Sequence, residues 1–149
     1  MPFPYSKILC PIAFDDNSAD ALAHAVSLAA NSGAIVYLLH VLQINPVTAQ
    51  GAMEGPAGQE LYDAQVEAAR AQLDELAATI PAGIGRELAV EIGEPGSLIV
   101  AAQQQLGVDL VVMATHGRRG LKHLILGSVA ERVLRESNAP VLTLRGTKE

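Results

Sequence analysis

The sequence has a single cysteine, no long apolar run and none of the common catalytic signatures. Cys10 is that cysteine, so an internal disulfide is excluded and a reducing compartment is indicated. No run of residues approaches the ~20 apolar residues of a membrane span, and the N-terminal residues lack the apolar core of a signal peptide. The patterns GxxxxGK followed by Ser or Thr, GxGxxG after the first strand, and GxSxG are missing as well. These absences favour a cytoplasmic protein without the marks of a strong catalyst.

Length and charge narrow the class of protein further. The chain has 149 residues, half of them apolar, which suits one globular domain over residues 1–149. A net charge of −6 and a pI ≈ 5.1 argue against a general nucleic-acid or membrane-surface role, because both favour a basic face. The positive charge is nevertheless concentrated, since residues 110–135 hold Glu131 as their only acid. Five of the ten Lys and Arg residues lie there: Arg118, Arg119, Lys122, Arg132 and Arg135.

Five short apolar runs alternate with helical stretches along the chain. The predicted strands are residues 8–12, 34–42, 88–92, 110–113 and Val141–Leu144, and the predicted helices are 15–33, 60–80, 95–106 and 129–136. Strict alternation predicts parallel strands joined by right-handed crossovers, and therefore a three-layer α/β/α fold. Ligands bind such sheets beyond the carboxyl ends of the strands, where the strand order reverses. The alternation alone does not give that order.

One segment interrupts the alternation of predicted strands and helices. Residues 43–59 carry three glycines and two prolines without any periodicity, so we expect a long loop. A loop of this length is typically either a functional lid or a linker, and the sequence leaves both readings open.

The stretch at residues 110–130 (LVVMATHGRRGLKHLILGSVA) is the most informative of the sequence. An apolar strand gives way to a basic, glycine-punctuated loop, and a helix then begins at Gly127 and Ser128. Glycines before a helix start bring backbone N–H groups close to an anion, so a nucleotide phosphate is the leading ligand. The glycines could also serve only as turn residues, and Ser128 only as a helix cap. We interpret His116 as a loop-orienting residue, because no catalytic partner can be assigned to it.

These residues resemble the universal stress protein family. Its ATP-binding members carry a glycine, two residues, a second glycine, nine residues, and then Gly-Ser or Gly-Thr. Gly117, nine intervening residues, Gly127 and Ser128 match the second half of that pattern, whereas Ala114 stands at the first glycine. The resemblance extends from KILCPIAFDDNSADAL through LLHV and GSVAERVL to APVLTLR. It implies a doubly wound five-stranded parallel sheet with strand order 3-2-1-4-5.

The resemblance also implies a nucleotide site between the loops after the first and fourth strands. The ribose and adenine would lie near the end of the first strand and the end of the second. The phosphates would lie around the glycine loop and the start of the last helix. The residues at matching positions are Pro11, Ile12, Ala13 and Val41 on the first side, and Met113, Ala114, Gly117, Gly127, Ser128 and Val129 on the second.

Two residues depart from the family pattern. Ala13 replaces an aspartate and removes a carboxylate that would accept hydrogen bonds from ribose hydroxyls. Asp15, two residues further on, is an alternative acceptor. Ala114 replaces a glycine, which is harmless if the backbone there has a negative φ and costly if it does not.

Two functions follow as alternatives. The first is a cytoplasmic stress-response protein that binds ATP, ADP or AMP, with or without Mg²⁺, signals through nucleotide occupancy and hydrolyses ATP slowly at most. The second is a dimeric interaction module that has lost nucleotide binding, as Ala13 and Ala114 suggest. In the family the last strand, here Val141–Leu144, resembles an edge that pairs with a second copy, and an unidentified protein partner is expected. An ATP-consuming ligase is disfavoured, because the acidic loop at residues 13–16 would repel phosphate.

Overall fold

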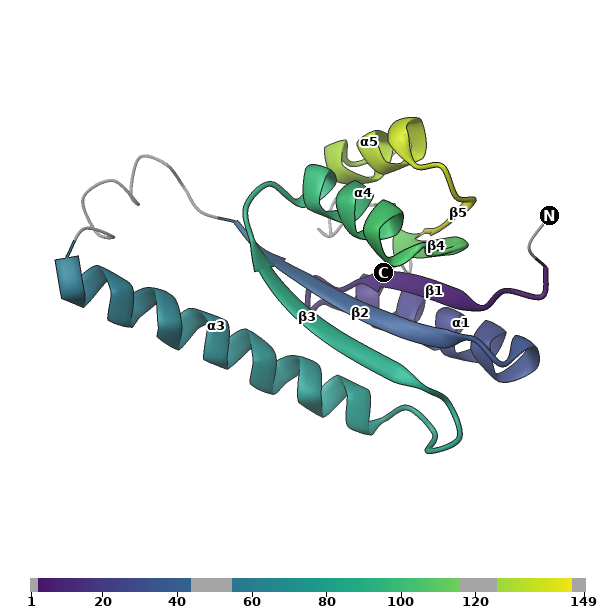
Figure 1. Cartoon of the computed structure of the whole chain (residues 1–149), viewed down its shortest axis with the longest axis horizontal. Helices are drawn as coiled ribbons and strands as arrows, with labels where there is room; N and C mark the ends of the chain where they lie inside the picture. Colours follow the sequence, from purple (N-terminus) through teal and green to yellow (C-terminus); the bar gives the residue numbers. More distant parts are fainter. Residues whose placement is uncertain (1–2, 44–54, 116–125, 146–149) are drawn as a thin grey trace.

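The computed structural model describes residues 3–43, 55–115 and 126–145. Its strands are β1 (Lys7–Pro11), β2 (Ile35–Leu42), β3 (Arg86–Ile92), β4 (Leu110–Ala114) and β5 (Val141–Leu144). Its helices are α1 (Asp16–Ser32), α3 (Gly55–Ala78), α4 (Pro95–Leu106) and α5 (Ser128–Glu136). Strands and helices alternate as the sequence predicts (Figure 1).

The five strands form one parallel sheet in the order β3-β2-β1-β4-β5. This order confirms the predicted doubly wound fold class. The strand order reverses between β1 and β4, which lie side by side with Ile8 opposite Leu110. The carboxyl ends of these two strands therefore leave the same edge of the sheet, where ligands of such folds bind.

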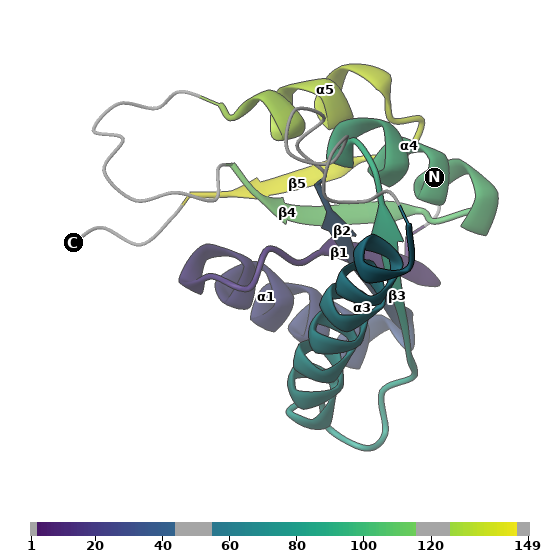
Figure 2. The same ribbon diagram turned by 90° about the vertical axis from the view of Figure 1, so that its left-hand side faces the viewer.

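Helices cover the two faces of the sheet in pairs. Figure 2 shows α1 and α3 on one side and α4 and α5 on the other. Alternate residues of β1 enter two separate cores: Ile8 and Cys10 pack with α1 and α3, and Leu9 packs with α4 and α5. All three side chains are fully buried. The central strands therefore need apolar residues on both faces, which explains their near-continuous apolar sequences.

The helix ends agree closely with the sequence signals. Asp15 caps α1 through the backbone N–H of Ser18, and Gly33 ends that helix in the left-handed conformation with φ 77°. Pro95 occupies the first turn of α4 as expected. At α5 the cap is Gly127, and Ser128 is already helical. The reading of Ser128 as a helix cap is therefore wrong, because the helix begins one residue earlier than predicted.

The predicted loop at residues 43–59 is wrong in its last part. Residues 55–59 form the first turn of α3, and residues 44–54 lie outside the described residues. Pro56 masked the helix in the sequence, although proline is tolerated in a first turn where its missing N–H has no intrahelical acceptor. The question of a lid or linker thus concerns a shorter segment.

Arg86 fixes the connection between α3 and β3. Its guanidinium donates hydrogen bonds to the carbonyls of Ala77, Ile80, Pro81 and Ile84. A planar group with five donors can hold several carbonyls at once, which a lysine ammonium could not do in the same geometry. The strand consequently begins at Arg86, two residues before the predicted start.

Candidate functional site

The loop between β1 and α1 is held in place at both ends. The Ile12 N–H donates to the carbonyl of Leu39 at 2.8 Å, which extends the pairing of β1 with β2. The Ala13 N–H donates to the hydroxyl of Ser18 at 3.2 Å. Pro11 is therefore the last residue of β1, Ile12 and Ala13 follow it directly, and Ala13 is exposed. Position 13 lies on a loop at the strand-order reversal, where the family resemblance implies the ribose side of a site.

Asp15 is engaged in the cap of α1. One of its carboxylate oxygens accepts the Ser18 N–H at 2.8 Å, and the Ser18 hydroxyl reaches back to the Asp15 N–H at 3.3 Å. This reciprocal capping box satisfies two backbone donors at once. The carboxylate considered as a substitute for the missing aspartate at position 13 thus already serves the helix start.

Phe14 and His40 form a clamp on this loop that the sequence did not reveal. The His40 Nδ1 atom lies 2.7 Å from the carbonyl oxygen of Ile12, so Nδ1 carries the hydrogen and donates it. The ring of Phe14 lies on the imidazole with centroids 4.3 Å apart. Phe14 has φ 59°, a conformation that costs a non-glycine residue about 1–3 kcal/mol. No signal in the sequence marks His40 for this contact or a phenylalanine for positive φ.

The end of β4 meets the start of α5 through the backbone. The Gly127 N–H donates to the carbonyl of Thr115 at 2.8 Å, and the Thr115 N–H donates to the carbonyl of Leu144 at 2.9 Å. The first intrahelical bond runs from the Glu131 N–H to the Gly127 carbonyl, and no side chain caps the helix. The N–H groups of Ser128, Val129 and Ala130 precede any intrahelical acceptor and form an open first turn.

The structure answers the question raised by Ala114. Among the described residues Phe14 is the only non-glycine residue with positive φ, so Ala114 has ordinary extended backbone in β4. The replacement of glycine is therefore the harmless case. Met113, its neighbour, is buried among residues of α4 and α5. Gly117 and His116 lie outside the described residues.

Val41 lies at the same edge of the sheet as the other predicted residues. It is in β2 two positions beyond Leu39, which stands opposite Pro11, and it packs partly buried against the α4 and α5 side. The structure thus brings Pro11, Ile12, Ala13 and Val41 to one edge. Because β4 lies beside β1, the residues 113–114 and 127–129 reach this edge as well.

Comparison with known proteins gives the family. The model of the universal stress protein family matches residues 4–145. The chain is 32% identical over 148 residues to Universal stress protein MJ0531 of Methanocaldococcus jannaschii, covering 97% of this chain and 85% of that protein. It is 34% identical over 143 residues to Universal stress protein A homolog 2 of Coxiella burnetii, covering 95% of each. The chain belongs to the universal stress protein family.

Solved structures agree with this membership. The structure of MJ0577, a universal stress protein of Methanocaldococcus jannaschii, has a TM-score of 0.84 at 29% identity and covers 97% of this chain and 99% of its own. A universal stress protein solved in complex with cAMP has a TM-score of 0.66 at 22% identity, with 94% and 96% covered, and shares the fold. The family resemblance in the sequence is confirmed, and it assigns a stress-response role at the level of the family.

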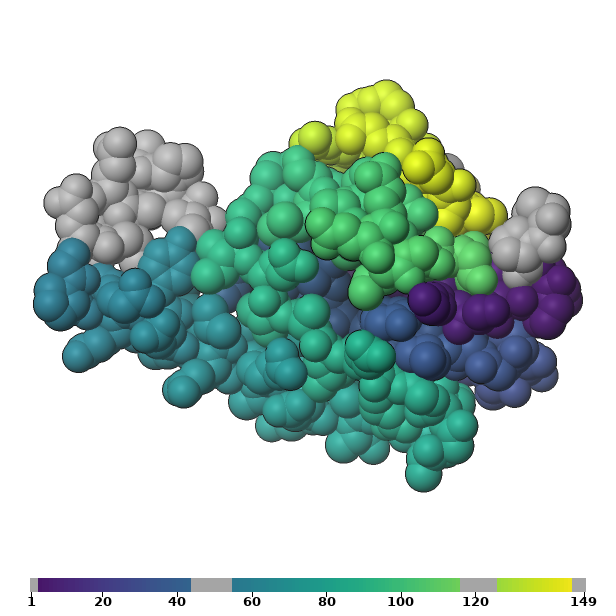
Figure 3. Space-filling view, in the orientation of Figure 1, coloured from purple at the N-terminus to yellow at the C-terminus, as the bar shows by residue number. Residues whose placement is uncertain are grey.

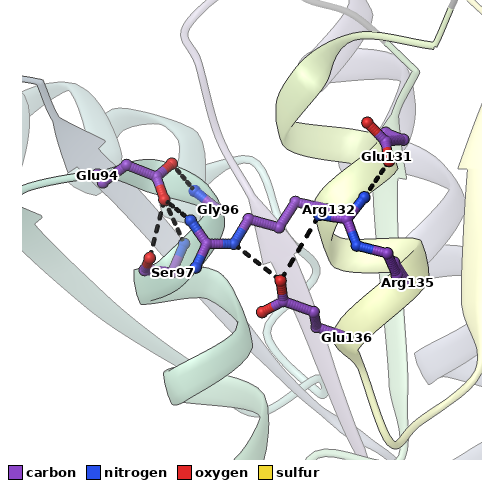
Figure 4. A network of polar contacts seen from close by, with 7 residues as sticks. All are labelled: Glu94, Gly96, Ser97, Glu131, Arg132, Arg135 and Glu136. Carbon is purple, nitrogen blue, oxygen red and sulfur yellow. Dashed lines mark hydrogen bonds and ion pairs between the residues drawn. The ribbon is translucent and has the colours of Figure 1, made fainter.

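Two basic residues of this universal stress protein are neutralised by nearby acids. Arg132 pairs with Glu94 and Glu136, and Arg135 pairs with Glu131 and Glu136, as Figure 4 shows. The expectation that Arg132 and Arg135 add free positive charge to the anion loop is therefore not met. The charge count over residues 110–135 did not include these acids, because Glu94 and Glu136 lie outside that range. The remaining candidates, residues 118, 119 and 122, lie outside the described residues.

Glu94 joins α4 to α5. Its carboxylate accepts the N–H groups of Gly96 at 2.7 Å and Ser97 at 3.0 Å and also binds Arg132 of α5. The hydrogen bond from the Ser97 hydroxyl, the two backbone N–H groups and the Arg132 charge lower the pKa of the Glu94 carboxyl and outweigh its desolvation. These interactions stabilise the helix whose partner, α5, supplies the open first turn.

We expect Glu94→Ala to lower the free energy of unfolding by about 1 kcal/mol at neutral pH, the size of a lost helix cap. Because folding lowers the pKa of Glu94, its contribution is present above the pKa of an unfolded glutamate and is lost as the pH falls through the lower folded-state pKa. The difference between wild type and variant should therefore shrink in acid. Urea unfolding at several pH values measures this, with the exposed Glu75→Ala as a control. Equal stability of Glu94→Ala and wild type at pH 7 would contradict the assignment.

Cys10 has no part in the site. It is fully buried in β1, and burial raises the pKa of its thiol to about 12. We expect no reaction of the folded protein with Ellman's reagent at pH 8, since only the thiolate reacts, and one thiol per chain after denaturation. A rapid reaction of the native protein would show that β1 opens.

Within ranges 3–43, 55–115 and 126–145, no group of three or more His, Cys, Asp and Glu side chains could hold a metal ion. In the same ranges, no helix is long and apolar enough to cross a membrane.

Proposed function

We propose that this universal stress protein binds an adenine nucleotide, ATP, ADP or AMP, above the carboxyl ends of β1 and β4. Nucleotide occupancy is the signal in this proposal, and hydrolysis is slow at most. The site comprises the ten residues that match the family positions: Pro11, Ile12, Ala13, Val41, Met113, Ala114, Gly117, Gly127, Ser128 and Val129. The cAMP complex of a protein with this fold supports the choice of an adenine nucleotide.

The open first turn of α5 is the observation that carries this proposal. The N–H groups of Ser128, Val129 and Ala130 lack intrahelical acceptors, and Gly127 offers no capping side chain. A phosphate accepts such N–H groups and is further stabilised by the positive end of the helix dipole. The Gly127 N–H already donates to the Thr115 carbonyl, so it is not a donor for the phosphate. In this proposal the lack of a side chain at Gly127 lets the phosphate come close to the backbone.

The ordered loop after β1 supports binding of the nucleoside part. The Phe14 and His40 clamp holds the carbonyl of Ile12, and Ser18 holds the N–H of Ala13. A loop that is already fixed loses little conformational freedom when a ligand binds, which favours affinity. Without a carboxylate at position 13, we expect phosphate contacts to supply most of the binding energy.

The nucleotide content of the purified protein tests the proposal directly. Heat denaturation followed by nucleotide chromatography should release ATP, ADP or AMP, and millimolar nucleotide should raise the melting temperature of stripped protein. Parallel titrations with and without Mg²⁺ separate metal-assisted from metal-independent binding. If no nucleotide is released and no thermal shift occurs, the proposal is wrong.

Ser128→Pro is a sharp variant for the phosphate contacts. Proline is tolerated at a first helical position, and Gly127 already has the extended backbone, φ −63° and ψ 158°, that a residue before proline requires. The variant should fold normally but lose one N–H donor and the hydroxyl. We expect ATP affinity to fall about tenfold or more, the effect of losing one hydrogen bond to a charged group. Ser128→Ala serves as the control that removes the hydroxyl alone, and unchanged affinity in both variants would contradict a phosphate at this helix start.

A dimeric interaction module without nucleotide binding is the second candidate. Ala13 lacks the ribose acceptor, and Asp15 is engaged in the cap of α1. β5 is an edge strand whose residues are all half-buried, and Leu134 on α5 is 41% exposed. Such an edge favours pairing with a second copy through Val141–Leu144. Sedimentation should then show a dimer that Thr143→Lys weakens, whereas a monomer at all concentrations would exclude this candidate.

A further inference from the structure

A recess lies on the α4 side of the sheet, over β2 and β3. It has a volume of about 140 Å³ and runs between strands β2 and β3 and the last turns of α4. Figure 3 shows the molecule with α4 and α5 above β3 and α3 below it. None of the residues assigned to the nucleotide site lines the recess. Helix α4 packs against β2, and the recess lies beside it where Glu87 and Glu91 of β3 are exposed.

The floor of the recess is apolar and its outer rim is acidic. Leu9, Leu39 and Ala102 form the buried floor, with partly buried Ala89 beside them. Glu87 and Glu91 are exposed and stand on β3 at either side of Ala89, all three on the same face of the strand. Four residues of extended strand separate their Cα atoms by roughly 13 Å.

Neither glutamate has a hydrogen bond or ion pair with any residue that the structure describes. Arg86, next to Glu87, is turned to the other face and engaged with carbonyls of the α3–β3 connection. Lys7 of β1 lies beside the C-terminal end of α4, where its Nζ atom donates to the Leu106 carbonyl at 3.0 Å. Burial together with the Glu87 charge raises the pKa of the Tyr37 phenol, in agreement with a carboxylate next to this wall of the recess.

We propose that this recess binds a linear aliphatic diamine or polyamine. Its two ammonium groups pair with Glu87 and Glu91, and its methylene chain lies over Ala89 and Leu39. Charge complementarity selects a dication, and the separation of the two carboxylates selects its length. The apolar floor favours methylene groups over a hydrated metal ion. The Gln105 side chain on α4 lies at the opposite wall, where it can accept a hydrogen bond from an inner amine.

Charged residues on an edge strand can also serve only to prevent pairing with other sheets. That role predicts no preference for the length of a ligand. The two readings are therefore separated by titrations of the ¹⁵N-labelled protein, monitored by NMR at low salt. The probes are spermidine, 1,8-diaminooctane, 1,4-diaminobutane, octylamine and Mg²⁺.

We expect spermidine and 1,8-diaminooctane to shift the amide signals of Tyr37, Ala89 and Gln105 and to bind several times more tightly than the shorter diamine, the monoamine or Mg²⁺. Glu87→Gln and Glu91→Gln should each weaken binding about fivefold, which corresponds to ~1 kcal/mol for one exposed ion pair. Glu75→Gln, an exposed glutamate on α3, should have no effect. Both rim substitutions change exposed side chains, so they should leave the melting temperature unchanged.

Equal affinities for the short and long diamines, or an affinity for Mg²⁺ equal to that for spermidine, would overturn the proposal. An undiminished affinity for spermidine in the variant that carries both Glu87→Gln and Glu91→Gln would overturn it as well. The nucleotide proposal is tested at other residues, so the two can fail independently.

Discussion

Replacing Ala13 with aspartate is expected to raise the affinity for ATP by about tenfold or more. Position 13 follows β1 on a loop fixed by Ser18 and by the Phe14 and His40 clamp, so a new carboxylate would be presented without reorganising the backbone. One hydrogen bond from a ribose hydroxyl to a carboxylate contributes about 1.5–3 kcal/mol, which is at least tenfold in the dissociation constant. Isothermal titration calorimetry with ATP measures the change.

Two controls make this result specific to the ribose. Ala13→Asn retains an acceptor of similar shape without the charge and should give a smaller gain. Titration with 2′-deoxyATP should also reduce the gain, because one hydroxyl is missing. Ala13 is exposed, so the variants should unfold at the same urea concentration as the wild type. If the wild type does not bind ATP and Ala13→Asp does, the dimeric interaction module is favoured as the function of the wild type. If both proteins bind ATP with the same affinity, the placement of the ribose at this loop is contradicted.

Leu73→Ala is expected to lower the free energy of unfolding by about 2–5 kcal/mol, the largest stability effect we predict. Leu73 lies near the C-terminal end of α3, is fully buried and packs in the core between α1, α3 and the sheet. Removing its side chain leaves a cavity that the rigid strands β1 and β2 cannot close. Denaturant unfolding followed by circular dichroism gives the difference.

Leu61→Ala is the matched control on the same helix. Leu61 is 46% exposed, and the same substitution there should change the free energy of unfolding by less than about 0.5 kcal/mol. Because both variants replace leucine by alanine within α3, differences in helix propensity cancel. Similar losses in the two variants would show that α3 is not held to the sheet through Leu73.

The sequence predicted the element order because each element has its own local signal. The apolar runs placed the five strands within two residues of their observed ends, and Asp15, Gly33 and Pro95 marked helix ends through backbone chemistry that depends on few neighbours. The strand order came from the family resemblance instead, since alternation permits several orders. The start of α3 was missed because Pro56 and Gly58 look like loop residues whether or not a helix contains them.

The candidate site was less predictable, because its interactions join residues distant in the sequence. His40 holds Ile12 across 28 positions, and Arg132 reaches Glu94 across 38. Neither contact leaves a spacing that a sequence motif would show. The positive charge of residues 110–135 is smaller than their sequence suggests, because Arg132 and Arg135 pair with Glu94, the cap of α4, and with Glu136, which both lie outside this range. The roles of the ten nucleotide-site residues remain predictions.

The bridge between α4 and α5 constrains which residues its positions accept together. A side chain at Gly96 would place its Cβ 2.8 Å from the Cδ atom of Arg132, so the arginine would have to leave its present path to Glu94. Glycine at 96, a carboxylate at 94 and arginine at 132 are therefore a linked set. In an alignment of the family, we expect these three positions to covary, with larger residues at 96 accompanied by shorter ones at 132.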